Sequence, residues 1–144
     1  MNFSFINQHA NKRAPVARLQ KLLRHLPVAK IHGKKNLSIV FVDDKQIAKL
    51  SKQFGRAFHA TDILTFPDSE KKSPLAGEII ISLDTARRQA NEREISFTDE
   101  LLLLIIHGVL HLQGFNDENR AAWKKMKEAE YKYFATILRK EKRA

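Results

Sequence analysis

The chain contains no cysteine and no long uninterrupted hydrophobic run. Without cysteine it can form neither a disulfide nor a thiolate metal site, which fits a reducing cytosol. Its longest apolar stretch, residues 101–112, is interrupted by His107 and Gly108, and it is shorter than the roughly 20 residues that span a bilayer. The segment MNFSFINQHANKR at the N-terminus lacks the apolar core of a secretory signal peptide. We therefore expect a cytoplasmic protein without a membrane segment.

Acidic residues are scarce relative to basic ones. The 144 residues include 16 Asp and Glu against 26 Lys and Arg, a formal charge of +10. Such a surplus favours a polyanionic partner, with nucleic acid ahead of an anionic membrane. We expect nucleic acid and no membrane. The length predicts one domain, residues 1–144, which can bury about 70% of its unfolded surface.

The apolar periodicity predicts four strands and five helices. Strands are expected near Phe3–Ile6 and at 37–42, 63–66 and 78–83, with a polar loop at 68–76. The first helix is expected from Pro15 to Leu26, and the second from a cap at Asp43 or Asp44 up to Gly55. The third is expected from a cap at Asp84 or Thr85 through Ala90, and the fourth from a cap at Thr98 through residue 112. The last is expected at 120–140, with its end in a frayed cationic tail, 139–143. Short links predict that the third and fourth strands form a hairpin-like pair. The predicted fold class is α+β in layers, with about five helices on a small mixed four-stranded sheet.

The segment HGVLHLQGFND, residues 107–117, contains the candidate metal ligands. Residues four apart on a helix lie about 40° apart around its axis, so His107 and His111 leave one face and can reach one metal ion. Gly114 can end the helix in a left-handed conformation, and the chain can then bring Asp117 to the same point. Two imidazoles and one carboxylate leave a position open, as in catalytic zinc sites. We expect one Zn²⁺ per chain at His107, His111 and Asp117.

A histidine pair at this spacing is by itself more often a packing feature than a metal site. Here the helix is apolar all round, so both rings lie in or near the core, where polar groups need partners. The spacing also resembles the HExxH motif, but Gly108 stands where that motif has its glutamate base. If this chain were a peptidase of the HExxH type, it would therefore lack the general base.

Four segments carry a family likeness. These are TDILTFP (61–67), AGEIIIS (76–82), HGVLHLQGF (107–115) and the pair Met126 and Glu130. In this order and spacing they resemble the YbeY family of bacterial endoribonucleases, whose motif runs His-Gly-x-Leu-His-Leu-x-Gly-Tyr/Phe-Asp-His. The likeness spans roughly residues 37–130, and it is much more specific than the histidine pair alone.

Two departures from the family pattern matter. Asp117 stands at the family's third metal-ligating histidine, and Asn116 stands at the aspartate before it. A carboxylate in the ligand set is a harder donor and adds negative charge. Phe54-Gly55 stands where the family has Tyr-Arg, and Arg56 follows one place later. The resemblance makes Arg56 the candidate for the catalytic arginine that lines the family's cleft; the alternative is a solvated arginine after a helix-ending glycine.

The resemblance implies a zincin-like fold and a metal-dependent, single-strand-specific endoribonuclease. Its implied role is 16S rRNA 3′-end maturation and ribosome quality control, with single-stranded RNA and the small ribosomal subunit as partners. Two alternatives stay open: another zinc metallohydrolase, such as a peptidase, and a non-catalytic ribosome-binding factor with a structural metal. Candidate phosphate-binding or base-stacking residues are Lys34, Lys35, Arg56, Lys71, Lys72, Arg87, Arg88, Phe58 and Phe66.

Overall fold

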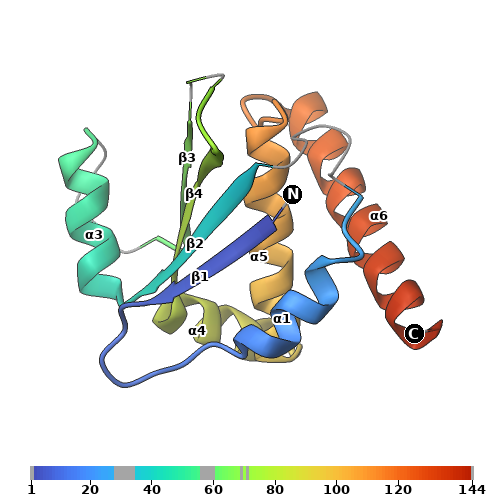
Figure 1. The fold of residues 1–144 in the computed structure, drawn as a ribbon, viewed down its shortest axis with the longest axis horizontal. Coiled ribbons are helices and arrows are strands. Elements are labelled where there is room, and N and C mark those ends of the chain that lie inside the picture. Colours follow the sequence, from blue (N-terminus) through green and yellow to red (C-terminus); the bar gives the residue numbers. More distant parts are fainter. Residues whose placement is uncertain (1, 28–34, 56–60, 69, 71, 144) are drawn as a thin grey trace.

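A four-stranded mixed sheet forms the centre of the molecule (Figure 1). The computed structural model describes residues 2–27, 35–55, 61–68, 70 and 72–143. The strands are β1 (Asn2–Asn7), β2 (Asn36–Val42), β3 (Ile63–Pro67) and β4 (Leu75–Ser82), in the order β1-β2-β4-β3. β1, β2 and β4 are parallel, and β3 is antiparallel to β4. The expected mixed sheet and the pairing of the third and fourth strands are confirmed.

The described residues form five helices, the expected number. They are α1 (Val16–Leu23), α3 (Asp44–Gln53), α4 (Leu83–Arg93), α5 (Phe97–Leu112) and α6 (Arg120–Arg143). Helices α1, α5 and α6 cover one face of the sheet and α3 the other, while α4 lies at the end of β4 and leads into α5 (Figure 1). Within the described ranges no single helix could span a membrane; α4 and α5 meet the length and composition criteria only as a pair bent by 113°.

Alternating side chains on the strands separate two cores. On β2, Leu37, Ile39 and Phe41 pack with α1, α5 and α6, whereas Val40 and Val42 pack with α3. Successive side chains of a strand point to opposite faces, so a strand covered on both faces is apolar throughout. This explains why LSIVFV reads as a continuous apolar run.

Helix α5 begins earlier than expected. The Ser96 side chain caps it by accepting the backbone N–H of Asp99 at 3.0 Å, so the expected cap at Thr98 is wrong. Phe97, the first helical residue, packs against the main core. Burial of this ring within the first turn favours the earlier start, and serine is among the best N-cap residues.

Helix α4 also begins earlier than expected. Ser82 caps it by accepting the backbone N–H of Thr85 at 3.3 Å, whereas Asp84 or Thr85 was the expected cap. Leu83, fully buried, is the first helical residue. Asp84 is therefore available for long-range contacts. At α3 the expectation of a cap at Asp43 or Asp44 is confirmed, because Asp43 caps that helix in a capping box with Gln46.

The expected frayed tail at 139–143 is wrong, because α6 continues to Arg143. Glu141 accepts hydrogen bonds from Arg18 at 2.7 Å and from the His25 ring at 3.0 Å, and these contacts tie the helix end to the α1 region. Three other boundaries shift by three residues: α1 ends at Leu23 rather than Leu26, β4 begins at Leu75 rather than Glu78, and α4 ends at Arg93 rather than Ala90. The strand is longer because its first residue pairs with Asn36 of β2.

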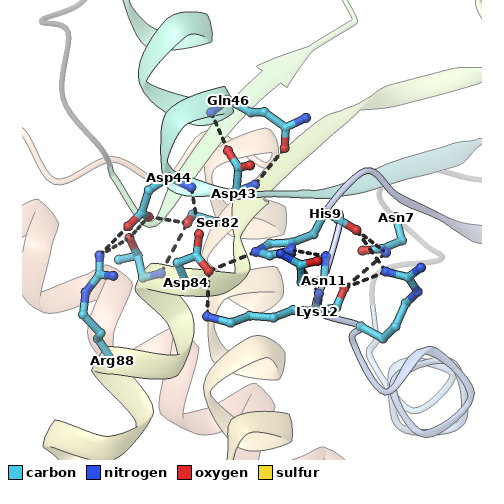
Figure 2. Close-up of polar contacts among 12 residues, drawn as sticks. Asn7, His9, Asn11, Lys12, Asp43, Asp44, Gln46, Ser82, Asp84 and Arg88 are labelled. Carbon is cyan, nitrogen blue, oxygen red and sulfur yellow. Dashed lines mark hydrogen bonds and ion pairs between the residues drawn. The ribbon is translucent and has the colours of Figure 1, made fainter.

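Asp84 joins the three connections that leave the parallel strands (Figure 2). Its carboxylate accepts hydrogen bonds from His9 Nε2 at 2.9 Å, Lys12 Nζ at 2.7 Å and the Asp44 backbone N–H at 3.0 Å. Burial raises the pKa of Asp84, but the hydrogen bonds from Lys12 and His9 outweigh it and hold this pKa far below its usual range. The carboxylate therefore links the turns after β1, β2 and β4.

The His9 ring is fixed in one tautomer. Its Nδ1 accepts backbone N–H groups from Asn11 at 3.1 Å and Lys12 at 3.0 Å, so the hydrogen resides on Nε2 and is donated to Asp84. His9 is 7% exposed. A buried imidazole is acceptable here because both of its nitrogens have partners.

We predict that Asp84→Ala lowers the free energy of unfolding by about 2 kcal/mol, because it leaves His9 and Lys12 without their charged acceptor. The pKa of Asp84 is lower in the folded than in the unfolded state, so its contribution is present above the ordinary value of 3.8 and is lost as the pH falls through the folded value. Urea unfolding should therefore show a difference from wild type at about pH 7 that narrows towards about pH 3. Glu92→Ala, at an exposed position of α4, is the control; an equal loss in both variants would contradict the role of Asp84.

Candidate functional site

The two histidines of α5 converge on one point. His107 Nε2 and His111 Nε2 lie 3.0 Å apart, and the rings meet edge to face. They line a cleft of about 380 Å³ between α5 and β3. The lining residues are Asp62, Ile63, Thr65, Pro67, His107, His111, Leu112 and Asp117. The expected shared face of the two histidines is confirmed.

The outer nitrogens of both rings have acceptors. His107 Nδ1 lies 2.5 Å from Glu130 Oε1, and His111 Nδ1 lies 3.1 Å from the carbonyl oxygen of Phe115. A carbonyl can only accept, so His111 carries its hydrogen on Nδ1. Burial raises the pKa of Glu130, but hydrogen bonds from His107 and Lys127 outweigh it and keep this pKa below its ordinary value. Glu130 is therefore a carboxylate that accepts from His107 Nδ1.

This arrangement aims two nitrogen lone pairs at each other. When both rings are neutral, both Nε2 atoms lack a hydrogen, and at 3.0 Å they repel unless a cation lies near both. Burial, followed by the neighbouring His107, lowers the pKa of His111 and favours the neutral ring. Neutral imidazoles whose other nitrogen is bound to a carboxylate or a backbone carbonyl are the usual metal-ligand form. The donor set therefore fits a divalent metal.

The turn after α5 supplies the acceptor for His111. Gly114 has φ +97°, and its N–H donates to His111 O at 3.0 Å, while the Phe115 N–H donates to Leu110 O at 3.0 Å. These two bonds form a Schellman motif, which needs a left-handed residue at the glycine position. Phe115 packs against the core, and its carbonyl is thereby held beside the imidazole. The expected helix end at Gly114 is confirmed.

Gly108 marks the closest approach of α5 to the sheet. A Cβ on Gly108 would lie 2.6 Å from Ile79 Cδ1 and 3.3 Å from Ile63 Cδ1. A side chain at this position would point into the sheet instead of the cleft. A glutamate here would therefore not reach the cleft in the way that the glutamate of HExxH reaches its metal site.

Asp117 is exposed and lines the same cleft. Its charge tends to raise the pKa of His111, although burial dominates. Within the described residues no three His, Asp or Glu side chains are gathered closely enough to hold a metal ion. The structure thus brings the two histidines together and leaves Asp117 at the rim, so its role as third ligand stays a prediction.

Several candidates lie elsewhere. Arg56, Phe58, Lys34 and Lys71 lie outside the described residues. Arg88 pairs with Asp44 at the carboxyl edge of the sheet, and the Arg87 guanidinium lies 3.9 Å from the centre of the Phe97 ring. Neither arginine lines the cleft. Phe66 packs with the core on the α3 side.

Two carboxylates at the site carried no assigned role in the sequence analysis. Asp62 lines the cleft beside His107, and Glu130, 6% exposed, holds that ring. Both fall in segments that resemble the family, TDILTFP and Met-x-x-x-Glu. These segments are the feature of the sequence from which Asp62 and Glu130 could have been predicted as site residues. A second, smaller cavity of about 100 Å³ shares Asp62 and His107 with the cleft. Its other lining residues are Arg93, Glu100, Leu103, Leu104, Lys127, Glu130 and Tyr131.

Comparison with known proteins identifies the family. A family profile described as Endoribonuclease YbeY matches residues 5–138. Proteins named Endoribonuclease YbeY are 34% identical over 132 residues in Thermus thermophilus, covering 87% of this chain and 95% of the relative, and 38% identical over 110 residues in Bacteroides thetaiotaomicron, covering 75% and 80%. The solution structure of a Thermotoga maritima protein superposes with a TM-score of 0.67 at 28% identity, covering 96% of this chain and 92% of that one. The expected α+β, zincin-like fold is confirmed, and the chain belongs to the YbeY family of endoribonucleases.

Proposed function

We propose that this chain is a metal-dependent, single-strand-specific endoribonuclease that acts in the cytoplasm on the 3′ end of 16S rRNA and in ribosome quality control. The observation that carries the proposal is the convergence of His107 Nε2 and His111 Nε2 in a cleft of a YbeY-family fold. The name of the relatives, Endoribonuclease YbeY, supplies the reaction class. The charge of +10 suits single-stranded RNA on the small ribosomal subunit as partner.

His107 and His111 would hold one divalent ion, with Asp117 as the third ligand. Imidazole and carboxylate donors suit Zn²⁺. The chain has no cysteine that could bind the ion at another place. When bound, such an ion supplies Lewis acidity toward a phosphoryl oxygen and makes water more acidic.

The protein's own groups orient the two rings. Glu130 fixes the tautomer and angle of His107, and Lys127 balances the charge of Glu130 from 3.1 Å. The carbonyl oxygen of Phe115 does the same for His111. Because Gly108 faces the sheet, the carboxylates that border the cleft are Asp62 and Asp117.

Cleavage of RNA tests the proposal. We expect the purified protein to cut single-stranded RNA but not its duplex, to lose activity with a chelator and to regain it with Zn²⁺. The double variant His107→Ala, His111→Ala should lose more than about a hundredfold in rate. Mutation of a group that only hydrogen-bonds to a metal ligand already lowers metal affinity or activity by about 10–100-fold, and here two ligands are removed.

Equal cleavage by the double variant would trace the activity to a contaminating nuclease and refute the site. Hydrolysis of casein without hydrolysis of RNA would support a peptidase-type metallohydrolase. Binding to small ribosomal subunits that is unaffected by chelation, without cleavage, would support a non-catalytic factor.

Substitutions of Asp117 test whether this residue is a metal ligand or only caps the turn after α5. If Asp117 is the third ligand, Asp117→Ala should lower zinc affinity by orders of magnitude, because catalytic zinc is usually held by three protein ligands. Asp117→His should keep or increase the affinity, because the family pattern places a histidine there. If Asp117 only caps the turn, Asp117→Ala costs about 1 kcal/mol of stability and leaves zinc affinity almost unchanged. Calorimetric zinc titration of both variants beside wild type separates these outcomes.

Glu130 is predicted to tune metal binding through His107. Glu130→Gln keeps an acceptor near Nδ1 but removes the charge, so zinc affinity should fall by about tenfold; Glu130→Ala should cost up to about a hundredfold. Calorimetric titration measures both. Glu128→Gln, an exposed position on the same helix, should bind zinc as wild type does. Wild-type affinity in Glu130→Ala would show that the hydrogen bond does not serve the metal.

A further inference from the structure

Positive charge is concentrated on α6. The helix carries nine Lys and Arg residues against three Glu, a surplus of six out of the +10 of the whole chain. The basic residues are Arg120, Lys124, Lys125, Lys127, Lys132, Arg139, Lys140, Lys142 and Arg143. One 24-residue element thus holds more than half of the net charge that predicts a polyanionic partner.

Two large aromatic side chains of α6 are exposed. Trp123 is 50% exposed and Tyr131 is 66% exposed. The neighbouring aromatics Tyr133 and Phe134 instead pack against the core. At least half of the surface of each of these two residues is therefore accessible to a ligand.

Trp123, Lys127 and Tyr131 form a strip along one side of α6, which we call the α6 strip. They are spaced by four residues, so each lies one turn from the next with a rotation of about 40°. From Trp123 to Tyr131 the strip is about 12 Å long. A cation thus lies between two exposed rings.

The α6 strip leads to the candidate metal centre. Lys127 and Tyr131 line the small cavity together with Asp62 and His107, and these last two residues also line the main cleft. Lys127 Nζ lies 3.1 Å from Glu130 Oε2, and the other oxygen of Glu130 holds His107. The strip is therefore continuous with the site.

We propose that the α6 strip binds the unpaired nucleotides that flank the cleaved bond, with bases stacked on Trp123 and Tyr131 and the backbone beside Lys127. This rests on the proposed function. Aromatic rings interleaved with cations are the usual means by which proteins bind single strands, because every base has a stacking face. Bases in a duplex are already stacked and paired, so the strip selects single strands.

The chain provides its own probe, because Trp123 is its only tryptophan. Chelator-treated wild-type protein, which should not cut RNA, is titrated with a short single-stranded RNA and with its duplex. We expect the single strand to quench Trp123 fluorescence and the duplex to quench it much less. Fluorescence anisotropy of labelled RNA gives the affinity in parallel.

Substitutions test the two rings separately. Trp123→Ala and Tyr131→Ala should each weaken single-strand binding by about tenfold, within the range for loss of one stacked base. Trp123→Phe and Tyr131→Phe keep a ring and should restore most of the affinity. Ile6→Ala, which removes an exposed apolar side chain from β1, is the matched control and should bind as wild type does. Thermal unfolding confirms that each variant is folded.

RNA that binds the chelator-treated protein without changing Trp123 fluorescence, or alanine variants with wild-type affinity, would overturn the α6 strip. Cleavage of the same RNA by the zinc-loaded protein would still leave the proposed function intact. Quenching by vesicles of anionic lipid but not by RNA would assign the strip to a membrane surface and also overturn it. Quenching of the chelator-treated protein by RNA, together with no cleavage by the zinc-loaded protein, would keep RNA binding at the strip and refute the proposed function.

Discussion

The cleft histidines depend for their position on the contact between α5 and the sheet at Gly108. A Cβ on Gly108 would lie 2.6 Å from Ile79 Cδ1 of β4, so any larger residue would force the Ile79 side chain or α5 to shift. The residues one and three places away, His107 and His111, then project along the side of the contact, into the cleft beside β3. The same approach lets Asp62, just before β3, border the cleft together with the two histidines.

Helix α6 adds the second constraint. Met126 and Ile137 bury its inner face, and Glu130 on that face is 6% exposed. Burying a carboxylate is unfavourable unless it is paired, and here His107 and Lys127 supply the partners. The ordinary apolar packing of α6 thus delivers a charged group to the outer nitrogen of a candidate ligand, while its outer side carries the exposed rings and most of the excess cations.

The fold contains two polar networks that differ in how completely their members are paired. The network around Asp84 at the carboxyl edge of the parallel strands joins three turns, and each charged member drawn there has a partner (Figure 2). The network around Glu130 leaves two Nε2 atoms facing each other. Complete pairing suits a structural role, whereas two Nε2 lone pairs that face each other suit the metal site proposed above.

The sequence determined the elements and the histidine pair, because both depend on local periodicity. A short β-branched, apolar run predicted LSIVFV as a strand, and a spacing of four predicted that His107 and His111 share a face. The glycine turn at Gly114 was also readable, since its left-handed conformation is local. Helix limits were less certain because tertiary contacts shift them. Phe97, which packs against the core, starts α5 early, and Glu141 bound to Arg18 prevents the end of α6 from fraying. Only the tertiary structure decided that Glu130 lies against His107, that Asp62 borders the cleft and that Asp117 stays at its rim. These relations join residues far apart in the chain or separated by a turn, and their distances depend on how α5, α6 and the sheet pack rather than on any repeat in the sequence.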